Sequence, residues 1–296
     1  VNSEGAGVDS TLSLGVYGNS HGFLAARLKS RHSISCSVVA EHNGAMQRDY
    51  WYDSSRIASL MDDPKNIGQI AAQRTVKRLD AQKIKTQTAP VLFSPEMARG
   101  LFSNVFSAIG GTSQYRKASF LLDKLDQIIL PTWLSINEDP FVLQGLNSAS
   151  YDGEGVATKV NEIVTSGRLN TYLLSSYSAR KLGRRTTGHA GGVRNISISR
   201  GEKDLTAMLK TLDNGLFVTE LMGQGVNTIT GDYSRGAAGF WVENGEIKYP
   251  VEEITIAGNL TDMLKGIVEI GADIDKRSSL HVGSLLIEKM MIAGND

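Results

Sequence analysis

The second half of the chain consists of short apolar runs joined by tight turns, and this pattern constrains the fold most. The run AGFWVENGEIKYP contains the pair Asn244-Gly245, the strongest short-range signal for a β-hairpin. A second hairpin is expected about Ser166 and Gly167 in KVNEIVTSGRLNTYLLSS. Strands that follow one another through such tight turns pair in the antiparallel sense. The second half is therefore predicted to be built on antiparallel sheet.

Further apolar runs extend this pattern along the chain. Strands are expected at TLSLGVY, ARLKSRHSISCSVVAE, RDYWYDS, TAPVLFS, LFVTELMG, EITIAGN and SLLIEKMMI, and helices at 64–79, 97–109, 175–182, 202–212 and 260–266. A polar break is expected at INEDP, within the mixed segment 118–150. Because helices do not alternate regularly with strands, the predicted class is α+β, mainly antiparallel sheet, barrel-like or sandwich-like, with interspersed helices. No repeat or low-complexity linker divides the chain, so residues 1–296 are expected to form one region with a soft subdivision near residue 150.

Composition is that of a soluble globular protein and argues against several kinds of partner. Of the 296 residues, 41% are hydrophobic, and 31 basic residues balance 31 acidic ones. A neutral chain has no overall field that attracts nucleic acid or an anionic membrane, so neither is an expected partner. No apolar run approaches the ~20 residues that span a bilayer, and no secretory signal opens the sequence. The single Cys36 excludes an intramolecular disulfide, and a cytoplasmic location is expected.

The common catalytic motifs are either missing from the sequence or occur outside the structural context that their chemistry needs. No pair at the i, i+4 spacing of a helical zinc site occurs among the five histidines, which are His21, His32, His42, His189 and His281. No GxxxxGK[ST] phosphate loop is present. The G-x-S-x-G pattern occurs in GNSHG, but the run after it is an expected strand, whereas a serine nucleophile of this motif lies between a strand and a helix. The usual hydrolase and nucleotide-binding functions are therefore not indicated by motif.

Glycine-rich polar loops remain as candidate functional segments, namely GNSHG, DGEG, TGHAGG, GQG and GDYSRGAAG. Glycine serves where φ is positive or another backbone comes close, so tight turns are one interpretation. The other is a cleft that receives an extended peptide by strand addition. His189 is the most site-like residue, although a lone histidine is more often a hydrogen-bonded structural residue than a proton shuttle. The peptide-cleft candidates are Gly188, His189, Gly191, Asp152, Glu154 and Glu220.

The helix expected at 97–109 has a polar face that packing alone does not explain. Its apolar residues recur at the spacing of one helical face, while small uncharged residues fall on the other face. The apolar residues are Met97, Leu101, Phe102, Val105, Phe106 and Ile109, and the polar residues are Ser103, Asn104 and Ser107.

Several long segments are specific enough to indicate a family. They are SYSARKLGRRTTGHAGGVRN, VTELMGQGVNTITGDYSRGAAGFWVENGEIKYPVEEITIAGN and GSLLIEKMMIAG, together with VYGNSHGF, MQRDYWYD, YRKASFLLDKLDQIILP and DGEG. In this order they resemble the TldD/PmbA family, in its PmbA-type (TldE) branch, over essentially the whole chain. The resemblance implies a further N-terminal region that this chain lacks, and a cytoplasmic role in maturing or degrading peptides. It also implies a TldD-type partner, with which this branch forms a heterodimeric zinc protease for unfolded peptides.

The resemblance further implies where a zinc site would lie. In the TldD branch, the helix that corresponds to 97–109 carries His-Glu-x-x-x-His, and a later cysteine completes the site. Aligned on the Arg-Lys pair of YRKAS, the two histidine positions fall on Ser103 and Ala108 and the glutamate position falls on Asn104. The cysteine position falls at or beside Val282, in SSLHVGS. Serine is a poor neutral zinc ligand, alanine and valine have no donor atom, and asparagine cannot act as a general base. No metal is therefore expected in this chain, and zinc is expected in the partner.

Three functions are compatible with these observations, and whether the chain is itself an enzyme is left open. The leading hypothesis is a non-catalytic subunit that encloses the partner's active site and guides unfolded peptide into it. The first alternative is an independently active peptidase that uses His189, Asp152, Glu154 and Glu220. The second is a regulatory module linked to DNA gyrase. A homodimer is the alternative assembly when the partner is absent.

Overall fold

The chain crosses three times between two units, and the computed structural model describes residues 1–295. Unit 1 comprises Val1–Ala81 and Val142–Ser148, and unit 2 comprises Gln82–Phe141 and the chain from Ala149 onward. The main division thus lies after Ala81, and the position near residue 150 is where the chain returns to unit 2.

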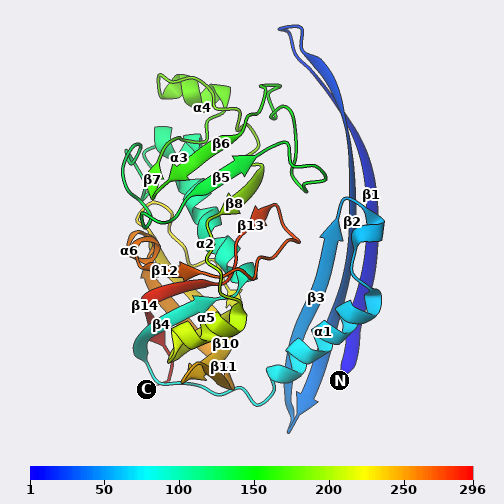
Figure 1. Cartoon of the computed structure of the whole chain (residues 1–296), viewed down its shortest axis with the longest axis vertical. Helices are drawn as coiled ribbons and strands as arrows, with labels where there is room; N and C mark the ends of the chain where they lie inside the picture. The colour runs from blue at the N-terminus through cyan, green and yellow to red at the C-terminus, as the bar shows by residue number, and fades with distance from the viewer. Residues whose placement is uncertain (296) are drawn as a thin grey trace. The chain divides into compact units, whose positions relative to one another are not determined.

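Unit 1 is a three-stranded antiparallel sheet with one long helix (Figure 1). Its elements are β1 (Asn2–Gly18), β2 (Leu24–His42), β3 (Ala45–Ser55), the 3-10 helix η1 (Ala58–Leu60) and α1 (Pro64–Lys77). The strand order is β1-β2-β3, and α1 packs against β2 and β3. The predicted start of α1 is confirmed, because Asp63 caps the helix by accepting a hydrogen bond from Lys65 N and Pro64 occupies the first turn.

Unit 2 contains a closed barrel of five strands. They are β4 (Gln87–Phe93), β9 (Gly215–Met222), β10 (Asp232–Glu243), β11 (Glu246–Asn259) and β14 (Leu285–Ala293). The order is β11-β10-β9-β4-β14, and the pairing of β11 with β14 closes the ring. β12 (Ile267–Ile270) pairs with the start of β14. Every pair is antiparallel except β4 with β9, which confirms the predicted α+β class and its barrel-like sheet.

A second sheet in unit 2 carries the loops that concern function. Its strands are β5 (Ile136–Asp139), β6 (Asn161–Thr165), β7 (Arg168–Leu169), β8 (Asn195–Ile198) and β13 (Leu280–His281). The order is β13-β8-β5-β6-β7. The expected polar break at INEDP was wrong, because INED is the central strand β5, with Ile136 and Glu138 buried on one face.

Both predicted hairpin turns are confirmed. Ser166 and Gly167 join β6 to β7 with φ of 49° and 75°, and Asn244 and Gly245 join β10 to β11 with φ of 52° and 74°. These positive values at both turn residues are those of a type I′ turn.

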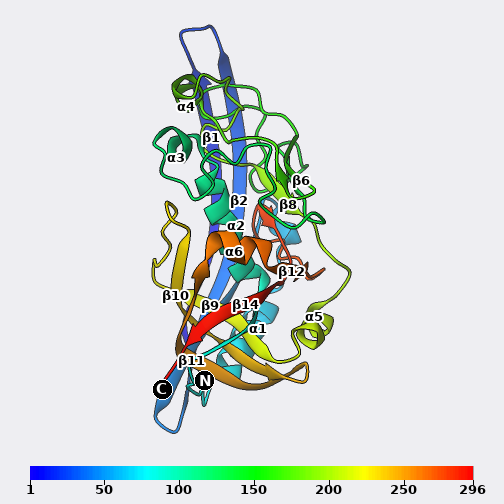
Figure 2. The same ribbon diagram turned by 90° about the vertical axis from the view of Figure 1, so that its left-hand side faces the viewer.

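Helix α2 lies between the barrel and the second sheet in both views of the molecule (Figures 1 and 2). The helices of unit 2 are α2 (Pro95–Ala108), α3 (Gly111–Tyr115), α4 (Ser176–Lys181), α5 (Leu205–Leu212) and α6 (Leu260–Lys265). Phe102 of α2 belongs to one buried cluster with Val91 of the barrel and Ile136 of the second sheet. The opposite face of β4 carries Leu92, which packs in a separate cluster with Met208 of α5. Within residues 1–295, none of the helices has the length and apolar character needed to cross a membrane.

Candidate functional site

The polar face of α2 satisfies its own hydrogen bonds. Ser103 and Ser107 are exposed and Asn104 is half-buried. Ser103 Oγ donates to Arg99 O at 2.9 Å, Asn104 Nδ2 to Gly100 O at 3.0 Å, and Ser107 Oγ to Ser103 O at 3.0 Å. Each bond reaches back one turn, a common arrangement for short polar side chains within a helix. The stripe therefore requires no ligand or neighbouring element to be stable.

The residues at the four positions that the family resemblance aligns with a zinc site do not fit zinc. Ala108 and Val282 are alkyl side chains with no exposed surface, and both lie in the main buried cluster. α2 is regular from Pro95 to Ala108, so Ser103 and Ala108, five residues apart, point to different sides. Among residues 1–295, no group of three or more His, Cys, Asp or Glu side chains is arranged to hold a metal ion.

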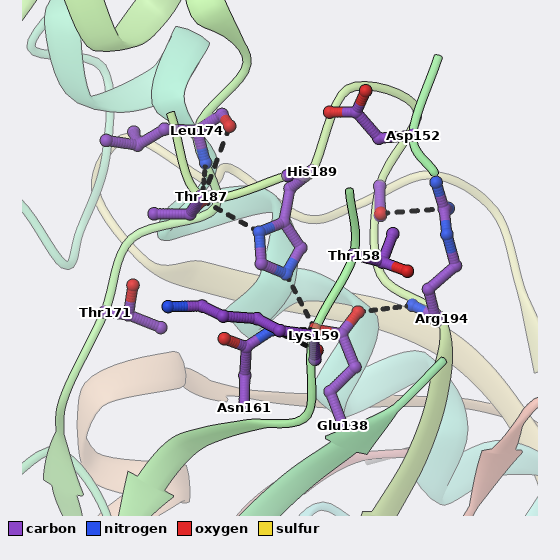
Figure 3. Close-up of polar contacts among 12 residues, drawn as sticks. Glu138, Asp152, Thr158, Lys159, Asn161, Thr171, Leu174, Thr187, His189 and Arg194 are labelled. Atoms are coloured by element: carbon purple, nitrogen blue, oxygen red, sulfur yellow. Dashed lines mark hydrogen bonds and ion pairs between the residues drawn. The ribbon is translucent and has the colours of Figure 1, made fainter. Parts of the chain in front are cut away.

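His189 lies in a buried polar cluster between the loop after α4 and strand β5 (Figure 3). Its Nδ1 is 2.8 Å from Thr187 Oγ1, and its Nε2 is 2.8 Å from Glu138 Oε2. Both ring nitrogens are thus engaged, and the imidazole side chain is only 2% exposed. In this arrangement the ring holds the TTGHAGG loop against the sheet and has no free nitrogen to offer a substrate.

Glu138 is the centre of this cluster, and it was missed because the polar sequence around it indicated a loop. Besides His189, its carboxylate accepts hydrogen bonds from Arg194 N at 2.6 Å and from Asn161 Nδ2 at 2.8 Å. Burial alone would raise the pKa of Glu138. The hydrogen bond and charge of His189, together with the hydrogen bonds from Arg194 and Asn161, lower it by more than burial raises it, so the pKa lies below its ordinary value. The alternation in Ile136–Asp139 was the available signal, since it places Glu138 on the buried face of a strand.

Asp152 and Glu154 link the DGEG turn to the loops around His189. Asp152 accepts hydrogen bonds from Glu154 N at 2.8 Å, Val156 N at 3.0 Å and Ala190 N at 3.0 Å. Glu154 Oε2 accepts from Ser176 N at 2.7 Å, where its negative charge meets the start of α4. Asp152 is 1% exposed. Each of the two carboxylates thus holds backbone N–H groups of neighbouring loops in place.

Five of the six peptide-cleft candidates therefore belong to one group of loops. Gly188 and Gly191 flank His189 with φ of 76° and 93°, which a residue with a side chain adopts only with strain. Glu220 lies elsewhere, on the barrel strand β9.

An ion network that the sequence did not reveal joins the start of α2 to the segment before β13. Arg277 Nη2 is 2.8 Å from Glu96 Oε1, Arg277 Nε is 2.8 Å from Asp275 Oδ1, and Arg99 Nη2 is 3.1 Å from Asp275 Oδ2. Burial alone would raise the pKa of Asp275, but hydrogen bonds from Arg277 and the charge of Arg99 lower it overall. The nearby His281 has a lowered pKa, chiefly because it is partly buried. The network holds the segment that leads to Val282 against α2.

An open pocket of about 220 Å³ lies next to the His189 cluster and is called the Arg184 pocket here. Its lining residues are Leu125, Asn170, Thr171, Tyr172, Leu174, Arg184, Arg185 and Thr187. Thr187 belongs to both features, because it lines the pocket and its hydroxyl contacts His189.

Comparison with known families accounts for almost the entire chain. Residues 2–79 match the PmbA/TldA metallopeptidase central domain, and residues 86–294 match the PmbA/TldA metallopeptidase C-terminal domain. The chain belongs to the PmbA/TldD family. The boundary between the two matched ranges coincides with the main division of the structure, which lies after Ala81.

Individual relatives support the same membership. The chain is 53% identical over 293 residues to Metalloprotease PmbA of Escherichia coli O157:H7, which covers 99% of this chain and 65% of that protein. It is 50% identical over 296 residues to the Metalloprotease PmbA homolog of Haemophilus influenzae, covering 100% of this chain and 66% of that protein. The chain thus spans about two thirds of the length of these two relatives.

Solved structures share the fold. A crystal structure of a candidate modulator of DNA gyrase from Bacteroides thetaiotaomicron has a TM-score of 0.93 and 29% identity, and the match covers 98% of this chain and 66% of that one. TldE from Thermococcus kodakarensis has a TM-score of 0.86 over 98% of this chain and 69% of that one, and at 22% identity it bears on the fold alone.

Proposed function

We propose that this chain is the PmbA-type subunit of a TldD/TldE zinc metallopeptidase, and that it encloses and guides unfolded peptide without catalysing its hydrolysis. A TldD-type subunit would supply the zinc, and the pair would mature or degrade peptides in the cytoplasm. The name metalloprotease belongs to the relatives, and family membership makes a protease-related role the natural setting for this chain.

One observation carries the proposal. In the TldD branch, the family resemblance implies zinc ligands and a general base at four positions. In this chain these positions hold Ser103, Asn104, Ala108 and Val282, of which the last two are buried alkyl side chains. Zinc peptidase chemistry needs a metal that lowers the pKa of bound water and a carboxylate that accepts its proton. These four residues provide neither function.

An independently active peptidase is less well supported by the same geometry. His189 uses both ring nitrogens internally, and Asp152 accepts three backbone hydrogen bonds while remaining buried. A general base must come within hydrogen-bond reach of the proton it removes, and these groups are already occupied.

The test combines metal analysis with a peptidase assay on the purified protein, the TldD-type subunit and their mixture. We expect zinc to be bound stoichiometrically only by the TldD-type subunit, and unfolded casein to be hydrolysed only by the mixture. The variant Ser103→Ala should leave the activity of the mixture unchanged. Stoichiometric zinc in this protein alone, together with hydrolysis of casein by it, would overturn the proposal.

A further inference from the structure

The Arg184 pocket carries positive charge that nothing in the described structure neutralises. Arg184 and Arg185 are exposed, and none of the lining residues is acidic. Within residues 1–295, neither guanidinium forms an ion pair with a carboxylate. A pocket with two unpaired arginines favours an anionic ligand.

Arg184 is already oriented for a planar anion. Its guanidinium carbon lies 5.7 Å from the centre of the Tyr172 ring, over the ring face. A guanidinium whose face is covered by an aromatic ring keeps its N–H edge free for a carboxylate, which it can bind through two parallel hydrogen bonds. Stacking thus leaves a directional site for a planar anion in the pocket.

The backbone that carries these arginines is fixed before any ligand arrives. Arg184 N donates to Ala179 O at 2.8 Å at the end of α4, and Thr187 N donates to Leu174 O at 3.1 Å. Leu174 N in turn donates to Thr187 Oγ1 at 2.7 Å. The loop is therefore tied at both ends, which reduces the entropy lost when a ligand binds.

The remaining walls and the size of the pocket restrict the kind of ligand. Leu125, Leu174 and the ring of Tyr172 provide an apolar wall, while Asn170 and Thr171 add polar groups. A volume of about 220 Å³ lies below the ~300–1,000 Å³ of pockets that enclose a whole small molecule. This space suits the end of a chain, with a charged group and one apolar side chain.

We propose that the Arg184 pocket binds the C-terminal carboxylate of an unfolded peptide, with the last side chain against Leu125 and Leu174. The inference rests on the proposed function, because that function brings unfolded peptides to this chain. It adds a substrate feature, since peptides with a free carboxyl end would be preferred. Capture of a terminal carboxylate is an established mode of peptide recognition.

The test uses a short, unstructured fluorescein-labelled peptide that ends in leucine, made as the free acid and as the C-terminal amide. Fluorescence anisotropy measures the binding of each to the purified protein. We expect the free acid to bind about tenfold more tightly than the amide, because hydrogen bonds to charged groups are the strong ones. In Arg184→Ala/Arg185→Ala, the affinity for the acid should fall to that for the amide.

A matched control separates the pocket from the general charge of the protein. Arg180→Ala/Lys181→Ala removes the same two positive charges from exposed positions of the neighbouring α4 and should keep the preference for the acid. Equal binding of acid and amide, or equal loss of the preference in both variants, would overturn the proposal. Displacement of the peptide by inorganic phosphate at far lower concentration than by acetate would overturn the carboxylate assignment as well.

Failure of this inference can be told apart from failure of the proposed function. If acid and amide bind equally while the mixture with the TldD-type subunit hydrolyses casein, the pocket assignment is wrong and the subunit role stands. If the acid preference depends on the two arginines while this protein alone carries zinc and hydrolyses casein, the pocket assignment stands and the non-catalytic role is wrong.

Discussion

His189 and Glu138 form a pair that is closed off from solvent, with 2.8 Å between Nε2 and Oε2 and 2% of each side chain exposed. The pair joins the loop after α4 to the middle strand of the second sheet. His189 also contacts the hydroxyl of Thr187, a residue that lines the Arg184 pocket. The pair should contribute to the stability of the fold, because a buried carboxylate that loses a hydrogen-bond donor still carries the free-energy cost of its removal from water.

Replacing His189 should therefore destabilise the protein. His189→Ala leaves Glu138 with two of its three hydrogen-bond donors and opens a small void beside Thr187. We expect a loss of about 1.5–3 kcal/mol in the free energy of unfolding, the usual contribution of a hydrogen bond to a charged group. Urea unfolding at neutral pH measures this change.

His21→Ala is the matched control for that experiment, because it removes the same side chain from an exposed position in the turn between β1 and β2. Its effect should remain within about 0.5 kcal/mol, as for most surface substitutions. Equal unfolding free energies for the wild type and His189→Ala would contradict a structural role for the pair.

The carboxylate of Glu138 also makes stability depend on acidity. Because the folded-state pKa of Glu138 lies below its ordinary value of 4.5, its stabilisation is complete above pH 4.5 and is lost as the pH falls through the lower folded value. Glu138→Gln cannot ionise, so its deficit relative to the wild type should shrink between pH 7 and the acid range. Urea unfolding of both proteins at a series of pH values provides the test, and a deficit that grows on acidification would reverse the sign assigned to this group.

Local signals in the sequence predicted much of the fold. Asn244-Gly245 and Ser166-Gly167 each determine a hairpin through the conformation of two adjacent residues, so no distant partner is needed. The closure of the barrel by β11 and β14, and the parallel pairing of β4 with β9, join segments far apart in the chain. Such pairings depend on packing of the whole unit and leave no local pattern.

The functional groups were harder to predict for the same reason. Glu138 sits among Asn137, Asp139 and Pro140, and this polar setting hid a strand whose other side chains alternate between core and surface. Arg277 and Glu96 are 181 residues apart, and nothing near either residue indicates the other. Opposite charges are common on any surface, so only the folded chain identifies the pair.

Gly167 should be far less tolerant of a side chain than Gly191, although both have positive φ. A Cβ at Gly167 would lie 2.2 Å from Leu130 O, whereas a Cβ at Gly191 meets nothing within 4 Å. Gly191→Ala should cost about 1–2 kcal/mol, the price of a left-handed backbone for an ordinary residue. Gly167→Ala should cost clearly more, because the clash with backbone oxygen adds to that strain. Chemical denaturation of the two variants compares them directly, and equal losses would show that the turn can move away from Leu130.

The last prediction concerns the residues that the family resemblance aligns with a zinc site, three of them on α2. Ser103→His places an imidazole in solvent and should change the unfolding free energy by no more than about 0.5 kcal/mol. Ala108→His forces a ring into a site with no exposed surface, and overpacking of this kind typically costs about 1–3 kcal/mol. Because the two positions point to different sides of a regular helix, the combined variant with Asn104→Glu and Val282→Cys should also fail to bind zinc. Urea unfolding and metal analysis of the purified variants measure both effects. Stoichiometric zinc without loss of stability would mean that the core can open at Ala108 and that a metal site is latent in this chain.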